Sequence, residues 1–235
     1  GQLFYSMSLA MGIMITYGSY MKKDIRLESS VKQIEIFDTG IAFLAGLMVI
    51  PAVFAFSGPE DLTAGAGLMF MTLPKVFNSM PLGGLVGTAF FVLVFFAALT
   101  SSISLMETVV SIVRDKTGLE RKPACVAVTV FTLLVGIPSS LGHGIWSHIM
   151  PLGMSILDAF DFVTNSVMMP IIAIFTCILV GFIIKPKAVI DEVKVTDGTF
   201  KSEKLFVVMI KWVCPIFLSL ILVCSILTAV GLFSF

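Results

Sequence analysis

The sequence predicts an all-α, polytopic helical membrane protein, and three observations support this prediction. Apolar residues make up 57% of the chain, charged residues make up only 13%, and the mean hydropathy is +1.05, values outside the usual range of soluble domains. The apolar residues fall into six runs, each close to or above the roughly 20 residues that a membrane span needs. Basic residues gather in alternate connections between these runs. The six runs are 1–20, 37–57, 81–113, 124–143, 150–184 and 205–233.

Composition and motif content exclude several functional classes. The formal net charge is zero, which indicates neither a nucleic-acid partner nor an acidic one. The four cysteines are far apart and lie in apolar runs, a pattern typical of neither a disulfide framework nor a zinc site. The chain has no nucleophile–base pair, phosphate-binding loop or metal-ligand spacing. We therefore expect no enzyme activity and no organic cofactor, and nothing in the sequence indicates the oligomeric state.

The first run, 1–20, carries residues that are unusual in a membrane helix. Tyr5, Ser6, Ser8 and Gly12 stand where leucine and valine are common. In hydrocarbon every backbone polar group needs a partner, and small or hydroxyl-bearing positions are where a helix can open and offer those groups to a ligand. We expect a break near residues 8–12 that forms half of a binding site. An interrupted run of this length is too short to cross alone, so we also expect the chain to be the C-terminal part of a longer protein.

The distribution of lysine and arginine predicts the orientation of the chain. Fourteen basic residues lie in or beside the connections 21–36, 114–123 and 185–211, against one in the connections 58–80 and 144–149. By the positive-inside rule the first three connections are cytoplasmic and the other two are external. The sequence therefore predicts a multi-pass protein of the inner (plasma) membrane.

Four carboxylates stand at or inside the predicted spans, namely Asp38, Glu107, Asp158 and Asp161. A carboxylate at mid-bilayer costs about 2.5–3.5 kcal/mol, so it persists where it binds something or faces water. Asp38 opens the second run, where it is either a helix N-cap or a functional charge. Glu107 lies in the third run, and the interpretation we favour is that it reaches the cytoplasmic interface.

The external connection 58–80 contains an apolar segment of its own, residues 67–74. Such a segment must bury its side chains against something. It forms either an external lid over a vestibule or a surface helix that serves packing alone, and the sequence does not separate these alternatives.

A stripe of small and hydroxyl residues runs along the third apolar run. Ala97, Thr100, Ser101, Ser104 and Leu105 recur at helical spacing and therefore share one face. Such stripes commonly serve helix packing. Alternatively, the hydroxyls and an incompletely used carbonyl form a sodium site, because a hard cation is bound by oxygen atoms.

Several segments resemble the second half of a bacterial neurotransmitter:sodium symporter with the LeuT-type fold. They are GQLFYSMSLAMGIMITYGSY at 1–20, KKD at 22–24, FMTLPKVF at 70–77, FFAALTSSISLME at 95–107 and LDAFDF at 157–162. The resemblance covers essentially the whole chain. It implies the second inverted repeat plus one further helix, and it places the first half of the binding site in a missing N-terminal half of the same transporter.

The resemblance also implies a function and the residues that perform it. It implies a sodium-coupled symporter of amino acids, with two Na⁺ ions and alternating access in a lipid bilayer. Methionine at position 11, where relatives often have phenylalanine, favours a hydrophobic or aromatic substrate because methionine adapts its shape. The implied substrate-binding residues are Tyr5, Ser6, Ser8, Met11, Ser101 and Leu105.

The same resemblance implies two ion sites and two gates. Ala97, Thr100 and Ser101 would form the second sodium site, and Ser6 and Asp38 would contribute to the first. The implied gate residues are Asp161 on the external side, and Asp115 and Tyr20 on the internal side. The competing class is a membrane channel or structural subunit whose hydroxyl stripes serve helix packing.

Overall fold

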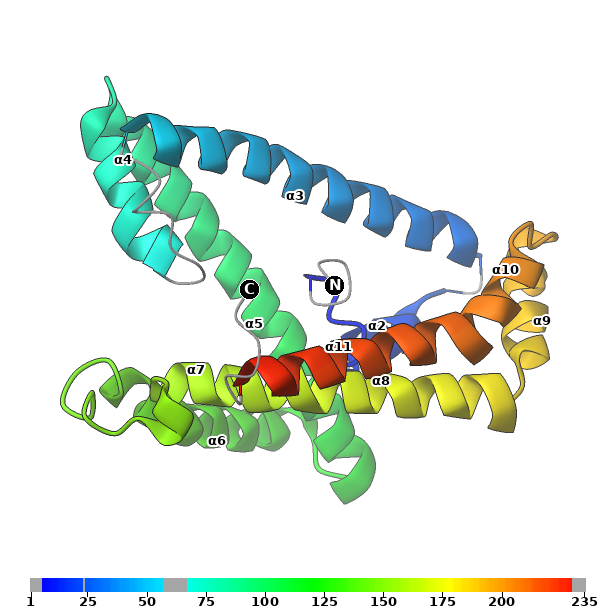
Figure 1. The fold of residues 1–235 in the computed structure, drawn as a ribbon. Coiled ribbons are helices and arrows are strands. Elements are labelled where there is room, and N and C mark those ends of the chain that lie inside the picture. The colour runs from blue at the N-terminus through cyan, green and yellow to red at the C-terminus, as the bar shows by residue number, and fades with distance from the viewer. Residues whose placement is uncertain (1–5, 23, 57–66, 230–235) are drawn as a thin grey trace. The chain divides into compact units, whose positions relative to one another are not determined.

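The computed structural model describes residues 6–22, 24–56 and 67–229. These residues form helices joined by turns and contain no β-strand (Figure 1), which confirms the predicted all-α class. The α-helices are α2 (Ile13–Tyr20), α3 (Leu27–Phe56), α4 (Leu73–Ser79), α5 (Gly83–Thr117), α6 (Arg121–Leu141), α7 (Ile156–Asp161), α8 (Met169–Ile178), α9 (Pro186–Asp197), α10 (Glu203–Val208) and α11 (Cys214–Ala229). A 3₁₀ turn, η3 (Pro151–Gly153), and π-helical segments η2 (Leu68–Thr72), η4 (Phe162–Met168), η5 (Leu179–Ile183) and η6 (Met209–Val213) complete the described helices.

Five helical stretches among the described residues are long and apolar enough to cross a membrane. They are Leu27–Ala55, Gly83–Thr117, Arg121–Leu141, Ile156–Ile183 and Glu203–Thr228. Little of each stretch is buried inside the chain, as expected for helices that meet lipid or another part of a larger protein. The chain is a membrane protein.

Helix α3 begins at Leu27, ten residues before the apolar run at 37–57. The extension is polar and is supported within the helix, where Lys32 Nζ lies 2.6 Å from Glu28 Oε1, because residues four apart face each other on a helix surface. Asp38 consequently lies inside α3 and not at its start, so the helix N-cap interpretation of Asp38 is wrong.

The chain divides into two units with separate cores. One unit comprises residues 33–104, and its core of Val53, Leu73 and Val76 joins the end of α3 to η2 and α4. The other comprises residues 1–32 and 105–235. This unit has one core between α5 and α6 and another between α8 and α11. Helices α8 and α11 lie side by side (Figure 1).

Candidate functional site

The helix expected over the first run is interrupted before α2. Residues 7–12 form turns and bends, and two of them have a left-handed backbone, Ser8 with φ 50° and Gly12 with φ 82°. A left-handed residue costs about 1–2 kcal/mol unless it is glycine, so Gly12 is suited to its place and Ser8 is held there by its surroundings. The Met11 N–H donates to the Ser8 carbonyl at 3.1 Å. Helical bonding resumes where the Thr16 N–H donates to the Gly12 carbonyl at 3.0 Å.

This break is packed against three other helices of its unit. A methyl group added to Gly12 would lie 3.3 Å from Cγ2 of Thr108 on α5. Ala10 packs on the cluster that joins α8 to α11. Ser8 and Met11 are half-buried and Ser6 is exposed, while Tyr5 lies outside the described residues. The packing therefore positions the break, and with it three of the predicted substrate-binding residues.

The stripe on α5 presents oxygen atoms at a regular spacing. The Thr100 hydroxyl donates to the carbonyls of Ala97 at 3.0 Å and Phe96 at 3.1 Å. Ser104 Oγ in turn donates to the Thr100 carbonyl at 3.0 Å. These bonds use the hydroxyl protons and leave hydroxyl lone pairs able to accept or to bind a cation.

The predicted second-site residues share an exposed face of one helix. Ala97, Thr100 and Ser101 are exposed within the chain, and Leu105 is 45% exposed. Ala97, Thr100 and Ser101 belong to the unit of residues 33–104, as does half-buried Asp38 on α3, whereas Leu105 and the break belong to the other unit. The predicted site residues are therefore divided between the two units.

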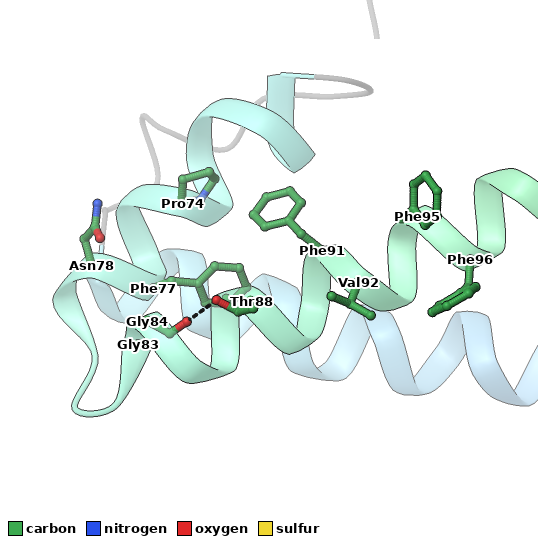
Figure 2. Close-up of a pocket in the computed structure, with 11 residues that line it drawn as sticks. Pro74, Phe77, Asn78, Gly83, Gly84, Thr88, Phe91, Val92, Phe95 and Phe96 are labelled. Carbon is green, nitrogen blue, oxygen red and sulfur yellow. Dashed lines mark hydrogen bonds between the residues drawn. The ribbon is translucent and has the colours of Figure 1, made fainter.

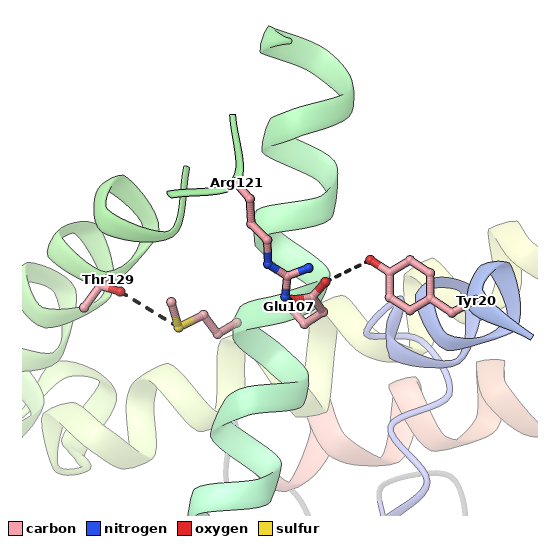
Figure 3. A network of polar contacts seen from close by, with 5 residues as sticks. Tyr20, Glu107, Arg121 and Thr129 are labelled. Atoms are coloured by element: carbon pink, nitrogen blue, oxygen red, sulfur yellow. Dashed lines mark hydrogen bonds and ion pairs between the residues drawn. The ribbon is translucent and has the colours of Figure 1, made fainter. Parts of the chain in front are cut away.

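A polar network joins α2, α5 and α6 around Glu107 (Figure 3). The Tyr20 hydroxyl donates to Glu107 Oε1 at 2.9 Å, and Arg121 Nη2 donates to Glu107 Oε2 at 2.7 Å. The Glu107 side chain is only 16% exposed. Sequence reasoning named Tyr20 as a gate residue but did not connect it to Glu107 or Arg121. The signal that was available is the carboxylate of Glu107 inside an apolar run.

The two other predicted gate residues lie in exposed positions. Asp115 lies in the last turn of α5 and is exposed. Asp161 ends α7, immediately before the π-helical segment η4, and its Oδ1 accepts a hydrogen bond from Asn165 Nδ2 at 2.6 Å.

The apolar segment 67–74 is helical and docks, with the rest of α4, on the first turns of α5. Phe77 of α4 lies against two glycines, because a Cβ at Gly83 would overlap the Phe77 carbonyl and a Cβ at Gly87 would lie 3.1 Å from the Phe77 ring. The Phe77 and Phe90 rings are 5.4 Å apart. A hollow of about 650 Å³ adjoins this contact and is lined by residues of α4 and α5, including Phe91 (Figure 2).

Comparisons with known proteins agree on one family. A model of the sodium:neurotransmitter symporter family matches residues 1–232. An uncharacterized sodium-dependent transporter of Haemophilus influenzae is 33% identical over 224 residues, which cover 95% of this chain and 48% of the relative. The uncharacterized sodium-dependent transporter YhdH of Bacillus subtilis is 30% identical over 238 residues, which cover 100% of this chain and 51% of the relative.

A solved structure matches as well. The crystal structure of MhsT in complex with L-phenylalanine has a TM-score of 0.84 and 36% identity, over 94% of this chain and 50% of that chain. The chain therefore spans about half the length of the relatives it matches, which fits the sequence-based resemblance to the C-terminal half.

Proposed function

The chain belongs to the sodium:neurotransmitter symporter family, and we propose that the protein carrying it is a sodium-coupled symporter of amino acids that works by alternating access. The observation that carries this proposal is the break at residues 7–12. Turns with a left-handed Ser8 and Gly12 expose backbone polar groups where a membrane helix would otherwise satisfy its own, and interrupted helices of this kind form the binding sites of many transporters.

The proposed substrate is a hydrophobic or aromatic amino acid. Backbone carbonyls near Tyr5 and Ser6, with the Ser8 hydroxyl, would accept hydrogen bonds from its ammonium group. Tyr5, Met11 and Leu105 would line the side-chain pocket, with Ser101 at its edge. MhsT, which is 36% identical to this chain, was crystallised in complex with L-phenylalanine. This supports the proposed class of substrate.

Two sodium ions would accompany the substrate. Ala97, Thr100 and Ser101 would bind one of them, and the 3.0 Å separation of the Thr100 hydroxyl from the Ala97 carbonyl oxygen supports a shared cation. Ser6 and Asp38 would contribute to the other site, with Asp38 as a fixed negative charge that makes chloride unnecessary. Each sodium charge that moves inward gains about 2.3 kcal/mol per 100 mV of membrane potential.

The proposed transporter lies in the inner (plasma) membrane with its missing N-terminal half supplying the remaining ligands. The connections 21–36, 114–123 and 185–211 would be cytoplasmic. Asp161 would act at the external gate, and Asp115 and Tyr20 at the internal gate. The contact of Tyr20 with Glu107 at 2.9 Å supports a role for Tyr20 in holding α2 at the internal side.

Substrate binding by the full-length protein tests this proposal. The purified protein would be incubated with radiolabelled L-phenylalanine in sodium chloride or in potassium chloride at equal ionic strength. We expect saturable binding in sodium only, displaced by unlabelled hydrophobic amino acids and not by lysine or glutamate. A channel or structural subunit would show no saturable binding in either salt, and that result would refute the proposal.

A further inference from the structure

A second hollow, separate from the predicted transport site, lies where two candidate membrane spans begin. Its volume is about 240 Å³. One wall comes from the start of α3 and the other from the connector between α9 and α10, and its lining residues are Arg26, Glu28, Ser29, Lys32, Thr199 and Lys201. The candidate spans Leu27–Ala55 and Glu203–Thr228 both begin at this hollow, so it lies beside the polar first turns of two helices that are long and apolar enough to cross a membrane.

The lining is polar and carries an excess of positive charge. Three cationic side chains face one carboxylate, and two hydroxyls add further hydrogen-bond donors. The carboxylate of Glu28 already binds Lys32 Nζ at 2.6 Å. Arg26 and Lys201 come from the two different walls and are both exposed.

The connector that carries Lys201 is held in place from both sides. Lys194 Nζ of α9 lies 2.6 Å from Glu203 Oε2 of α10. The ring of Phe200 packs on the ring of Phe206, with centroids 5.9 Å apart. These contacts tie the loop between α9 and α10 to its two flanking helices, and so they position the wall that carries Lys201.

We propose that this hollow binds the phosphate of an anionic glycerophospholipid headgroup in the cytoplasmic leaflet. Guanidinium and ammonium groups are the side chains that bind phosphate, and basic residues beside a membrane span attract anionic lipids by about 1 kcal/mol each. The basic connections 21–36 and 185–211 both belong to the side that the positive-inside rule assigns to the cytoplasm. The position at the start of two spans selects a lipid headgroup over a soluble phosphate compound.

The lipids retained by the full-length protein test this proposal. The purified protein would be titrated with dioleoylphosphatidylglycerol or dioleoylphosphatidylcholine, and the bound lipid would be measured by native mass spectrometry. We expect preferential binding of phosphatidylglycerol, weakened about tenfold or more by the double change Arg26→Gln with Lys201→Gln, which removes two charges. The matched control, Lys116→Gln with Lys122→Gln, removes two exposed basic charges outside the hollow and should leave the preference unchanged.

Two further arms separate the remaining outcomes. The charge-preserving double change Arg26→Lys with Lys201→Arg should retain the preference, which distinguishes a charged site from a folding defect. Inorganic phosphate in large excess over the lipid should not release phosphatidylglycerol, because inorganic phosphate lacks the acyl chains that bury apolar surface in the membrane. Three results would each overturn the assignment. The wild type and the Arg26→Gln, Lys201→Gln variant could bind the lipid equally, or the Lys116→Gln, Lys122→Gln control could lose as much binding as that variant. The third result is complete release of the lipid by inorganic phosphate.

Discussion

The hydroxyl of Tyr20 donates a hydrogen bond of 2.9 Å to the carboxylate of Glu107. This bond ties the last residue of α2, the helix that follows the break, to the C-terminal half of α5. Arg121, the first residue of α6, binds the other oxygen of the same carboxylate at 2.7 Å (Figure 3). One side chain within α5 therefore contacts the last residue of α2 and the first residue of α6.

Removing the Glu107 carboxylate should destabilise this unit. A hydrogen bond to a charged group contributes roughly 1.5–3 kcal/mol, but Arg121 is 61% exposed, so its share is small. We expect Glu107→Ala to lower the apparent melting temperature of the full-length protein by about 2–6 °C, and Tyr20→Phe to lower it by less. The measurement is thermal unfolding in detergent.

The matched control for this change is Glu120→Ala. Glu120 precedes α6, is exposed and makes no side-chain cap hydrogen bond. It should leave the melting temperature unchanged. Equal melting temperatures for Glu107→Ala and the wild type would show that the network does not hold the helices together.

Gly12 should be the least replaceable glycine of the first run. Its φ of 82° is strained for any side chain, and an added methyl group would press on Thr108 Cγ2 at 3.3 Å. We expect Gly12→Ala to destabilise the protein by about 1–2 kcal/mol and to abolish substrate binding. Gly18→Ala, a change on the same helix with nothing within 4 Å, should be neutral or stabilising. Equal behaviour of the two variants in binding and thermal unfolding would refute the geometry of the break.

The docking of α4 on α5 should depend on Gly83. A Cβ there would overlap the backbone of Phe77, which cannot move aside without displacing α4. Val76, only 1% exposed, provides a reporter: we expect a Val76→Cys protein to react with maleimide several-fold faster when Gly83→Ala is added. The neighbouring change Gly84→Ala meets nothing within 4 Å and should not alter the rate. A rate unaffected by Gly83→Ala would contradict this packing.

The hydroxyls of Thr100 and Ser101 should set the sodium requirement. If they bind a sodium ion, the double change Thr100→Ala with Ser101→Ala should raise the sodium concentration for half-maximal substrate binding by about tenfold or more, because a desolvated ion then lacks part of its oxygen shell. Ser102→Ala is the control, since its hydroxyl donates to the Leu99 carbonyl at 2.8 Å and stands off the stripe. An unchanged sodium requirement in the double variant would show that these residues do not bind the second sodium ion.

The parts of this structure that depend on composition and local pattern could be predicted from the sequence. The all-α class and the family follow from hydropathy and from several segments in a consistent order, and both are confirmed. Gly12 and the hydroxyl residues Ser6 and Ser8 indicate where a membrane helix opens, because glycine tolerates a left-handed backbone and serine hydroxyls can bind backbone groups that leave the helical pattern. The assignment of individual ligands at the site remains a prediction.

The parts that depend on long-range pairing could not be predicted. Tyr20 and Glu107 are 87 positions apart, and no local periodicity records that they meet. Similarly, hydropathy does not predict the start of α3 at Leu27, because the added turns are largely polar. Those turns are stabilised in part by the Glu28–Lys32 pair, whose members are four residues apart on the helix. The N-cap alternative for Asp38 fails for the same reason, since hydropathy marks where a span begins and not where a helix begins.

Concentrative uptake tests the central claim of sodium-coupled symport most directly. The full-length protein would be reconstituted into liposomes, and radiolabelled L-phenylalanine would be followed inside them under an inward sodium gradient. The account predicts accumulation above the external concentration, lost when potassium replaces sodium and when gramicidin collapses the gradient. Uptake that stops at the external concentration, or that is equal in sodium and potassium, would contradict it.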